Sequence, residues 1–382
     1  MESRIDATIK THFAGLEDPR SEINREHKLL DMVVIAILAV ICGANDWVAV
    51  AMFGRSKEEW LKTFLELPSG IPSHDTFWRL FRRLNPEPFQ LCFSRWITAV
   101  SQVTKGQVVA IDGKALRRSF DKGLGQGAIH MVSAWASANR LVLGQQKVDE
   151  KSNEITAIPK LLQLLDLKGC LVTIDAMGCQ TEIAQTIVEQ GADYLLALKK
   201  NQENLYEDVV LLFDDLQQSH FRAYPHDHAK TVDKDHGRIE IRQAWTISDP
   251  KLIRCLRGAE NWPNLRTVVK VQAERRLGPE VTVECRYFIS SCAHLDAKQL
   301  LHAVRTHWRI ENSLHWVLDI AFREDESRLR KDHSAQNFAI LRRIALSLLK
   351  QDASARAGVQ NRRLRAGWDH DYLLRIISPL FA

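Results

Sequence analysis

The stretch between residues 105 and 200 carries the pattern that most limits what this chain can fold into. Three apolar segments of strand character come first, and segments of helical character then alternate with two shorter apolar runs. The predicted strands are 107–112, 128–138, 140–148, 170–175 and 194–199, and the predicted helices are 155–167 and 181–189. The order β-β-β-α-β-α-β predicts a mixed sheet with helices packed on it.

The ribonuclease-H-like fold has this order of elements. A doubly wound nucleotide-binding fold would instead alternate strands and helices from its first strand. It would also carry a glycine fingerprint directly after a strand, and the sequence contains none. We therefore expect an α/β protein in which helices flank a ribonuclease-H-like mixed sheet.

The remaining parts of the chain differ from this core in character. Further strands are predicted at 238–247, 265–274 and 281–290, and residues 297–322 form one long helical pattern. We expect an N-terminal helical domain at 1–104, the first part of the core at 105–201, a β-rich insertion at 202–296, a helix completing the core at 297–333 and a helical, basic C-terminal tail at 334–382.

The amino-acid composition is typical of a globular protein, and it excludes few classes of binding partner. The 382 residues carry a net charge of +5, so any nucleic-acid role must rest on local features. Seven cysteines, an odd number without zinc-ligand spacing, argue against a disulfide framework and indicate a reducing setting. The polar N-terminus is no signal peptide, and the apolar run at 32–44 is too short to span a bilayer and predicts a buried helix. We expect a cytoplasmic protein without membrane association.

An arginine-rich segment at 73–84 is predicted to be an amphipathic helix. Ser73 or Asp75 can cap its start. Its apolar stripe is formed by Phe77, Leu80, Phe81 and Leu84. The residues largely off that stripe are Arg79, Arg82 and Arg83. This basic face could bind a nucleic-acid backbone or groove, or it could simply be solvated.

Two apolar strands end in an aspartate, Asp112 in VVAIDGK and Asp175 in VTIDAMG. A carboxylate that closes a buried apolar run is costly to desolvate unless something binds it. The expected fold makes these strands parallel neighbours about 4.8 Å apart, so the two carboxylates would nearly meet. A divalent cation relieves their repulsion, and oxygen ligands suit Mg²⁺ or Mn²⁺. The simpler alternative is that each aspartate only caps a turn before glycine.

A third carboxylate is expected from the long helical segment, where Glu311 is the candidate. His307, Glu311 and His315 recur at i, i+4 spacing on one face among bulky apolar neighbours, which favours a polar site over a solvated face. Zinc ligation by these three residues is an alternative, although HExxH spacing is absent. The acidic run 324–326 is expected to form surface ion pairs, and it offers an alternative third carboxylate.

Three such carboxylates fit a two-metal phosphoryl-transfer site. Two metal ions about 4 Å apart can activate water or a 3′-hydroxyl and stabilise the leaving oxygen of a phosphodiester. Basic side chains would then hold the phosphates. The candidates for phosphate or DNA contacts are Lys114, Arg117, Arg118, Lys199, Lys200, His307, Arg309, His315, Arg79, Arg82 and Arg83.

Long strings of the sequence resemble the bacterial insertion-sequence transposases of the H-repeat-associated type. These belong to the DDE class, which has a ribonuclease-H-like core. The similarity extends over almost the whole chain. The matching strings lie at 16–43, 110–119, 149–162, 172–180, 194–202, 235–242 and 309–322.

The resemblance implies cut-and-paste DNA transposition, in which metal-dependent hydrolysis at transposon ends precedes strand transfer by the freed 3′-hydroxyl. It implies that Asp112, Asp175 and Glu311 are the catalytic triad and bind two Mg²⁺ or Mn²⁺ ions. The implied partners are double-stranded DNA, as terminal inverted repeats and as target, and further copies of this chain on paired ends, in a homodimer or larger assembly. The implied location is the bacterial cytoplasm, at the nucleoid when bound to DNA.

The sequence departs from the wider group at one signature. That group carries Tyr-x2-Arg-x3-Glu-x6-Lys around its glutamate, and the corresponding positions here are Val304, His307, Glu311 and Leu318. Only the glutamate is retained, so the phosphate contacts of the other three residues do not carry over. Two other functions stay open from the sequence: a metal-dependent DNA nuclease without strand transfer, and a domesticated DNA-binding protein without turnover.

Overall fold

The computed structural model describes residues 11–13, 15–100, 106–120, 127–148, 153–235, 237–352, 354 and 356–378. The predicted domains and matching strings also include residues that lie outside the described ones, which are 1–10, 14, 101–105, 121–126, 149–152, 236, 353, 355 and 379–382. The chain divides into two compact units. The first comprises residues 1–103, 113–153 and 311–382, and the second comprises residues 104–112 and 154–310.

The strands form one mixed sheet in the order β3-β2-β1-β4-β5-β9-β8-β7-β6. The strands are β1 (Val108–Leu116), β2 (Ile129–Ala136), β3 (Leu141–Lys147), β4 (Leu171–Ile174), β5 (Asp193–Leu198), β6 (Asp227–Asp235), β7 (Arg238–Ile247), β8 (Thr267–Leu277) and β9 (Glu280–Ser290). Strands β1, β4 and β5 are parallel, whereas β2–β3 and all pairs from β5–β9 to β6–β7 are antiparallel. The expected ribonuclease-H-like mixed sheet with a β-rich insertion is thereby confirmed.

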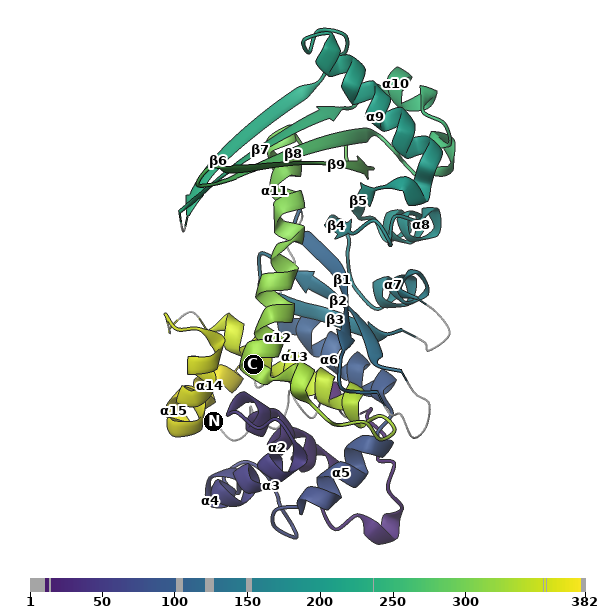
Figure 1. Ribbon diagram of the computed structural model, residues 1–382. Helices are drawn as coiled ribbons and strands as arrows, with labels where there is room; N and C mark the ends of the chain where they lie inside the picture. Colours follow the sequence, from purple (N-terminus) through teal and green to yellow (C-terminus); the bar gives the residue numbers. More distant parts are fainter. Residues whose placement is uncertain are drawn as a thin grey trace. The chain divides into compact units, whose positions relative to one another are not determined.

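The second unit packs its helices on its strands. Its helices are α7 (Glu154–Gln163), α8 (Thr181–Glu189), α9 (Glu203–Gln218), α10 (Pro250–Cys255) and α11 (Ala297–His307). Figure 1 shows α9 and α11 against the long strands β6–β9. They cover opposite faces, because Lys270 reaches Gln217 of α9 whereas its neighbours Val269 and Val271 pack in one cluster with Leu300 of α11.

Three elements of the insertion differ from the sequence expectation. Helices α9 and α10 and strand β6 were not predicted, although strands β7, β8 and β9 were. Strand β6 is an edge strand of sequence DHAKTVDKD with most side chains at least half exposed, so it has no apolar run to identify it. The predicted strands and helices of the core are confirmed within a few residues at each end.

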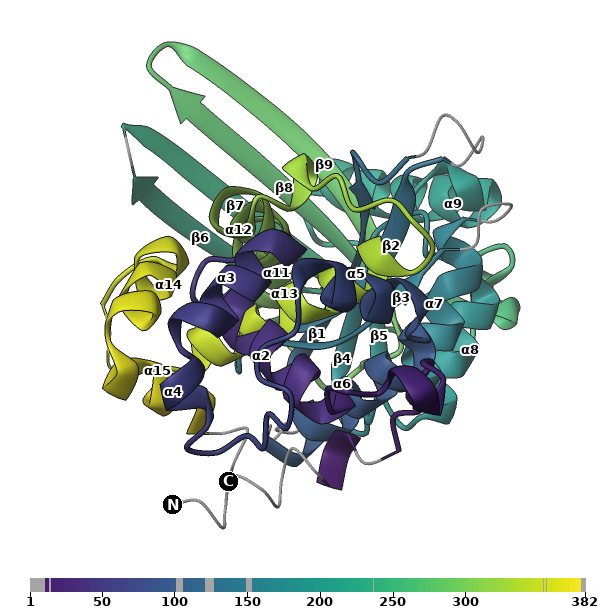
Figure 2. The same cartoon turned by 90° about the horizontal axis from the view of Figure 1, so that it is seen from below.

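The first unit is largely helical. Its helices are α2 (Leu29–Ile41), α3 (Trp47–Ser56), α4 (Glu58–Leu61), α5 (His74–Arg83), α6 (Pro86–Val100), α12 (Trp316–Phe322), α13 (Ser334–Gln351), α14 (Val359–Trp368) and α15 (His370–Ile377). Helix α2 is the predicted buried helix, with residues 32–41 no more than 3% exposed. Figures 1 and 2 show α13 beside it. No helix among the described residues is both long and apolar enough to cross a bilayer.

The N-terminal and C-terminal helices share one core. Trp47 stacks on Phe81 with ring centroids 4.6 Å apart and meets Phe338 of α13 edge-on at 4.8 Å. The side-chain amide of Asn337 donates to the carbonyl oxygens of Phe81 and Leu84, which satisfies the C-terminal end of α5. The arginine-rich helix α5 is therefore held by contacts with both α3 and α13.

Candidate functional site

Strands β1 and β4 bring the two predicted aspartates to adjacent positions. Their parallel register pairs Ile111 with Ile174, and the next residue on each strand is Asp112 or Asp175. Both aspartates are half-buried. The prediction that these strands are parallel neighbours is confirmed. The prediction that both aspartates end their strands is wrong for Asp112, because β1 continues in extended conformation to Leu116 after its apolar part ends.

The loop after β4 fixes the carboxylate of Asp175. Its Oδ1 atom accepts hydrogen bonds from the backbone N–H groups of Met177, at 3.1 Å, and Gly178, at 3.3 Å. The turn-capping role considered from the sequence is therefore real for this residue. A carboxylate has about four acceptor positions, so a cap using two of them leaves room for a cation.

The residues after β5 hold the same loop from the other side. The side-chain amide of Asn201 donates to the carbonyl of Ala176 at 2.8 Å, and that of Gln202 donates to the carbonyl of Cys179 at 3.0 Å. Gly178 also leaves no space for a side chain, because a Cβ atom there would lie 2.3 Å from Cγ2 of Ile174. These contacts give Asp175 a fixed position relative to β4 and β5.

His307 at the end of α11 lies against β4. Its Nδ1 atom is 3.1 Å from Oγ1 of Thr173, two residues before Asp175, and the side chain is 8% exposed. Burial lowers the pKa of His307 to about 4, although the charge of Asp175 opposes the shift. The imidazole is neutral at pH 7, so the structure argues against the predicted role of His307 as a basic phosphate contact.

A cleft of about 480 Å³ opens beside Asp175 in the second unit. It is lined by Asp175, Ala176, Ala197, Leu198, Lys199, Lys200, Tyr206, Glu284, Cys285, Arg286, Tyr287, Phe288, His307 and Trp308. The predicted candidates Lys199 and Lys200 are exposed in this lining. Sequence reasoning missed Arg286, whose guanidinium lies 4.4 Å from the ring centroid of Trp308. Only the pairing of β9 with β5 brings it there, and no local motif marks it.

Glu311 begins the C-terminal segment of the first unit, whereas the two aspartates belong to the second. Its side chain is exposed, and residues Glu311–His315 form a π-helical turn between α11 and α12. The single long helix predicted over 297–322 is therefore wrong, because the regular i, i+4 spacing is broken by this turn. Single π-helical turns inside helices occur frequently at functional sites.

Lys114 forms ion pairs within the first unit. It follows the first aspartate, Asp112, by two residues. Its side chain is 9% exposed, and its ammonium contacts the carboxylates of Asp319, Glu324 and Asp325. The distances to Glu324 and Asp325 are 3.5 and 3.4 Å. The structure therefore argues against Lys114 as a phosphate ligand, because its charge is already neutralised.

Glu324 corrects the expectation that the acidic run 324–326 forms only surface pairs. The residue is 2% exposed, and its Oε1 atom lies 2.9 Å from Nη1 of Arg343 and 3.9 Å from Nη1 of Arg342. Burial raises the pKa of Glu324, but Arg343, Lys114 and Arg342 outweigh burial and hold the pKa at about 2. The glutamate is therefore a charged, internal anchor of α13.

His315 shares the electrostatic surroundings of this cluster. Burial, and then the charges of Arg343 and Lys114, lower its pKa to about 4, against the opposing effect of Glu324. The imidazole is consequently neutral at pH 7. The structure argues against His315 as a basic DNA contact for the same reason as for His307.

The three arginines of α5 differ in exposure and in their contacts. Ser73 caps the helix by accepting from Thr76 N, and the predicted apolar stripe is buried. Arg79 and Arg83 are exposed and line a concave surface with Arg20, Ser21, Glu26, His27 and Thr76. Arg82 is instead 2.9 Å from a carboxylate oxygen of Asp332 and stacks over Trp78 at 4.6 Å. Two of the three predicted arginines thus remain available to a polyanion.

The remaining basic candidates are exposed. Arg117 is 79% exposed and lies 3.2 Å from Asp325. Arg118 is exposed, and its carbonyl accepts from the guanidinium of Arg330. Arg309, next to the π-helical turn, is also exposed. Their guanidinium groups can reach a ligand in solution.

Comparison with known protein families identifies two matching models. Residues 10–97 match a family described as DDE_Tnp_1-associated, and residues 104–348 match a family described as Transposase DDE domain. A solved piggyBac transposase synaptic complex with hairpin DNA covers 99% of this chain, and this chain covers 78% of that one. Its identity of 12% and TM-score of 0.42 are too low to support an argument.

Several relatives align over long stretches. The putative transposase YncI of Escherichia coli O157:H7 is 39% identical over 97% of this chain and 94% of its own length. The H repeat-associated putative transposase YhhI of Escherichia coli K12 is 38% identical over 97% of both chains. The inactive transposase YbfQ of the same strain is 36% identical over 19% of this chain and 86% of its own length. Because one model matches more than half of the residues and the two long relatives align almost end to end, this chain belongs to the transposase DDE domain family.

Proposed function

We propose that this protein is a cut-and-paste DNA transposase, which hydrolyses phosphodiester bonds at transposon ends and joins the freed 3′-hydroxyl to target DNA. Family membership supports transposase function in general. The observation that carries the catalytic assignment is the register of β1 and β4, which places Asp112 and Asp175 directly after a pair of register partners. Two carboxylates at that spacing repel each other unless a cation lies between them.

The donor set fits hard divalent cations. Asp112 and Asp175 offer carboxylate oxygens, and we assign the third carboxylate to Glu311, which is exposed on its π-helical turn. Carboxylate ligands suit Mg²⁺ or Mn²⁺. When bound, two such ions supply an activated nucleophile and stabilise the leaving oxygen of an in-line displacement.

The other residues of the second unit position the aspartate and the DNA. Neutral His307 holds Thr173 on β4, two residues before Asp175. Lys199 and Lys200 line the cleft beside Asp175, where their charges would hold the phosphate backbone next to the reacting bond. Arg286 also lines the cleft, but its guanidinium is paired with the carboxylate of Glu284. These side chains orient the substrate without acting as nucleophiles.

Further contacts would set the register of the DNA. We assign this role to the exposed arginines, which are Arg79, Arg83, Arg117, Arg118 and Arg309. We further propose that two or more copies act together on paired transposon ends in the bacterial cytoplasm. An exposed guanidinium suits this role because it can make two parallel hydrogen bonds to one phosphate.

A reaction with purified protein tests the proposal. The protein is incubated with Mg²⁺ and a duplex that carries the inverted repeats flanking its gene, together with a target plasmid. Joined products support a transposase. Cleavage without joining would instead indicate a nuclease, and binding without cleavage, unchanged in Asp112→Ala, would indicate a DNA-binding protein that does not turn over.

A further inference from the structure

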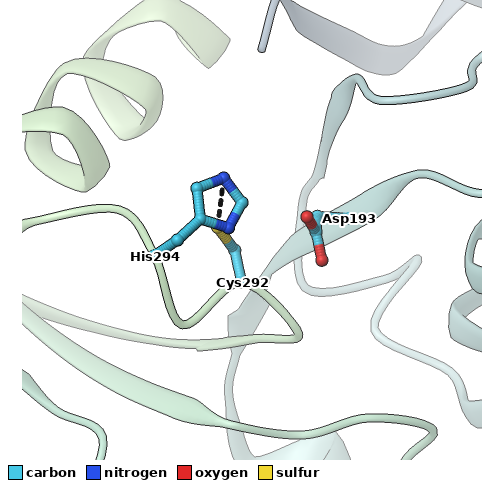
Figure 3. Close-up of side chains that lie close together, drawn as sticks. All are labelled: Asp193, Cys292 and His294. Atoms are coloured by element: carbon cyan, nitrogen blue, oxygen red, sulfur yellow. Dashed lines mark hydrogen bonds between the residues drawn. The ribbon is translucent and has the colours of Figure 1, made fainter. Parts of the chain in front are cut away.

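A cluster of side chains of the types that ligate metals lies away from the aspartate pair. Asp193 begins β5, and Cys292 and His294 follow the end of β9 (Figure 3). One ligand atom from each of the three residues lies within 4.8 Å of the other two. The cluster arises because β5 and β9 are antiparallel neighbours, with Leu195 opposite Ser290, so the start of one strand meets the end of the other.

This cluster is separate from the proposed catalytic site. The register pairs Asp193 with Leu171, the first residue of β4, whereas Asp175 follows the last residue of that strand. Four residues of strand correspond to about 13 Å, at roughly 3.3 Å per residue. The two sites therefore lie at opposite ends of the parallel strands, and the cluster cannot take part in phosphodiester chemistry at Asp175.

Two of the three ligands are held in place by hydrogen bonds. The hydroxyl of Ser291 donates to Oδ1 of Asp193 at 2.7 Å. The backbone N–H of Cys292 donates to Oγ of Ser290 at 3.1 Å, and its carbonyl accepts from Oγ1 of Thr267 at 2.9 Å. These bonds hold the carboxylate of Asp193 and the backbone of Cys292, and hydrogen bonds to the ligand residues are typical of metal sites.

The sulfur-to-nitrogen separation is close to that of two ligands on a tetrahedral ion, although the ring of His294 must turn to point one nitrogen at the ion. Sγ of Cys292 lies 3.3 Å from Nδ1 and 3.6 Å from Nε2 of His294. Zinc binds sulfur at about 2.3 Å and imidazole nitrogen at about 2.0 Å, which at a tetrahedral angle separates the two ligand atoms by about 3.5 Å. His294 is exposed, so a small rotation of its side chain can direct either nitrogen toward the ion. The carboxylate of Asp193 completes a set of sulfur, nitrogen and oxygen donors.

We propose that Asp193, Cys292 and His294 bind one zinc-class divalent cation, with a water molecule in the fourth position. The ion joins residue 193 to residue 292 and so closes the whole insertion onto the core strand from which it departs. Binding should stabilise the folded chain, because a cross-link that closes a long loop restricts the unfolded chain. The proposal does not depend on the catalytic assignment.

Cobalt absorbance of the full chain tests this site. The protein is stripped with a chelator and titrated with Co²⁺ in the absence of DNA, and the thiolate-to-cobalt charge-transfer band is recorded. We expect the band to saturate at one equivalent and Zn²⁺ to displace the cobalt. Zn²⁺ should also raise the thermal unfolding midpoint of the stripped protein, because it binds the folded state.

Matched variants separate this site from adventitious binding. His294→Ala changes an exposed side chain and should fold, yet it should weaken Zn²⁺ binding by more than about 100-fold. Cys292→Ser should abolish the band. Replacing the exposed Cys255 and Cys285 with serine, or Asp175 with asparagine, should leave it unchanged. The absence of a thiolate band in the wild type, or its persistence in both His294→Ala and Cys292→Ser, would overturn the proposal.

Discussion

Ile111 and Ile174 are register partners on parallel strands, and each is followed directly by an aspartate. This relationship sets the position of Asp112 within β1 and of Asp175 at the first residue after β4. Side chains positioned by strands are held more precisely than those on loops. Changes that disturb the end of β4 should therefore affect catalysis before they affect folding.

Gly178→Ala tests the loop that carries Asp175. The new Cβ would lie 2.3 Å from Ile174 and 3.1 Å from Ile158, so the loop must shift. We expect the free energy of unfolding to fall by about 1–3 kcal/mol, and DNA cleavage at saturating DNA to fall by about 100-fold. Gly127→Ala is the control, because a Cβ at Gly127 meets nothing within 4 Å. Equal activity of the two variants would contradict a fixed Asp175 loop.

The buried pair of Glu324 and Arg343 predicts a large effect on stability. Glu324→Gln keeps the shape of the side chain but leaves the buried guanidinium of Arg343 without its carboxylate partner, whereas Lys114 keeps Asp319 and Asp325. We expect urea unfolding to show a loss of about 3–5 kcal/mol. Glu326→Gln, which removes an exposed pair with Arg323, should change stability little. A small effect at both positions would show that Glu324 is not a buried anchor.

The same carboxyl group predicts how stability depends on pH. The pKa of Glu324 is about 2 in the folded chain, below its ordinary value of 4.5, so its contribution is fully present above about pH 4.5. That contribution is lost as the pH falls from about 4.5 toward 2, because the unfolded chain takes up the proton first. Unfolding of wild type and Glu324→Gln in urea should therefore converge across this window. Parallel curves would contradict the depressed pKa.

The lysines after β5 test the phosphate assignment. Lys199→Ala and Lys200→Ala should each weaken DNA binding and reduce the slope of log affinity against log salt by about 1. Lys168→Ala removes an exposed lysine that precedes β4, at the opposite end of the parallel strands. Binding measured by fluorescence anisotropy at several salt concentrations should be unchanged in that control. If all three variants showed the same slope as the wild type, Lys199 and Lys200 would not contact the DNA phosphates.

The sequence identified much of the fold because its core strands are continuous apolar runs with recognisable helices between them. Strand β6 escaped because an exposed edge strand has no such run, and the π-helical turn at Glu311–His315 escaped because no residue type marks it. The recurrence of apolar residues at i, i+3, i+4 and i+7 also made helix α5 predictable, including its buried stripe.

Contacts between side chains that lie far apart in the chain could not be predicted from the sequence. Lys114 looked like a phosphate ligand beside an aspartate, yet its partners lie more than two hundred residues later in the chain. Burial lowers the pKa of His307 and of His315, which the sequence did not reveal because a helical periodicity does not show which face is covered. The Asp193, Cys292 and His294 cluster was invisible because its members meet only through the pairing of β5 with β9.

The most direct measurement of the central claim is the yield of cleaved and joined DNA from Asp112→Asn, Asp175→Asn and Glu311→Gln in Mg²⁺. Each change removes a proposed metal ligand that contributes several kcal/mol to the transition state, so each should lower both yields by roughly 100- to 1000-fold or more. Unfolding midpoints should stay close to that of the wild type, and Glu326→Gln should retain full yield. Wild-type yields from any of the three ligand variants would contradict the assignment of that residue to the catalytic triad.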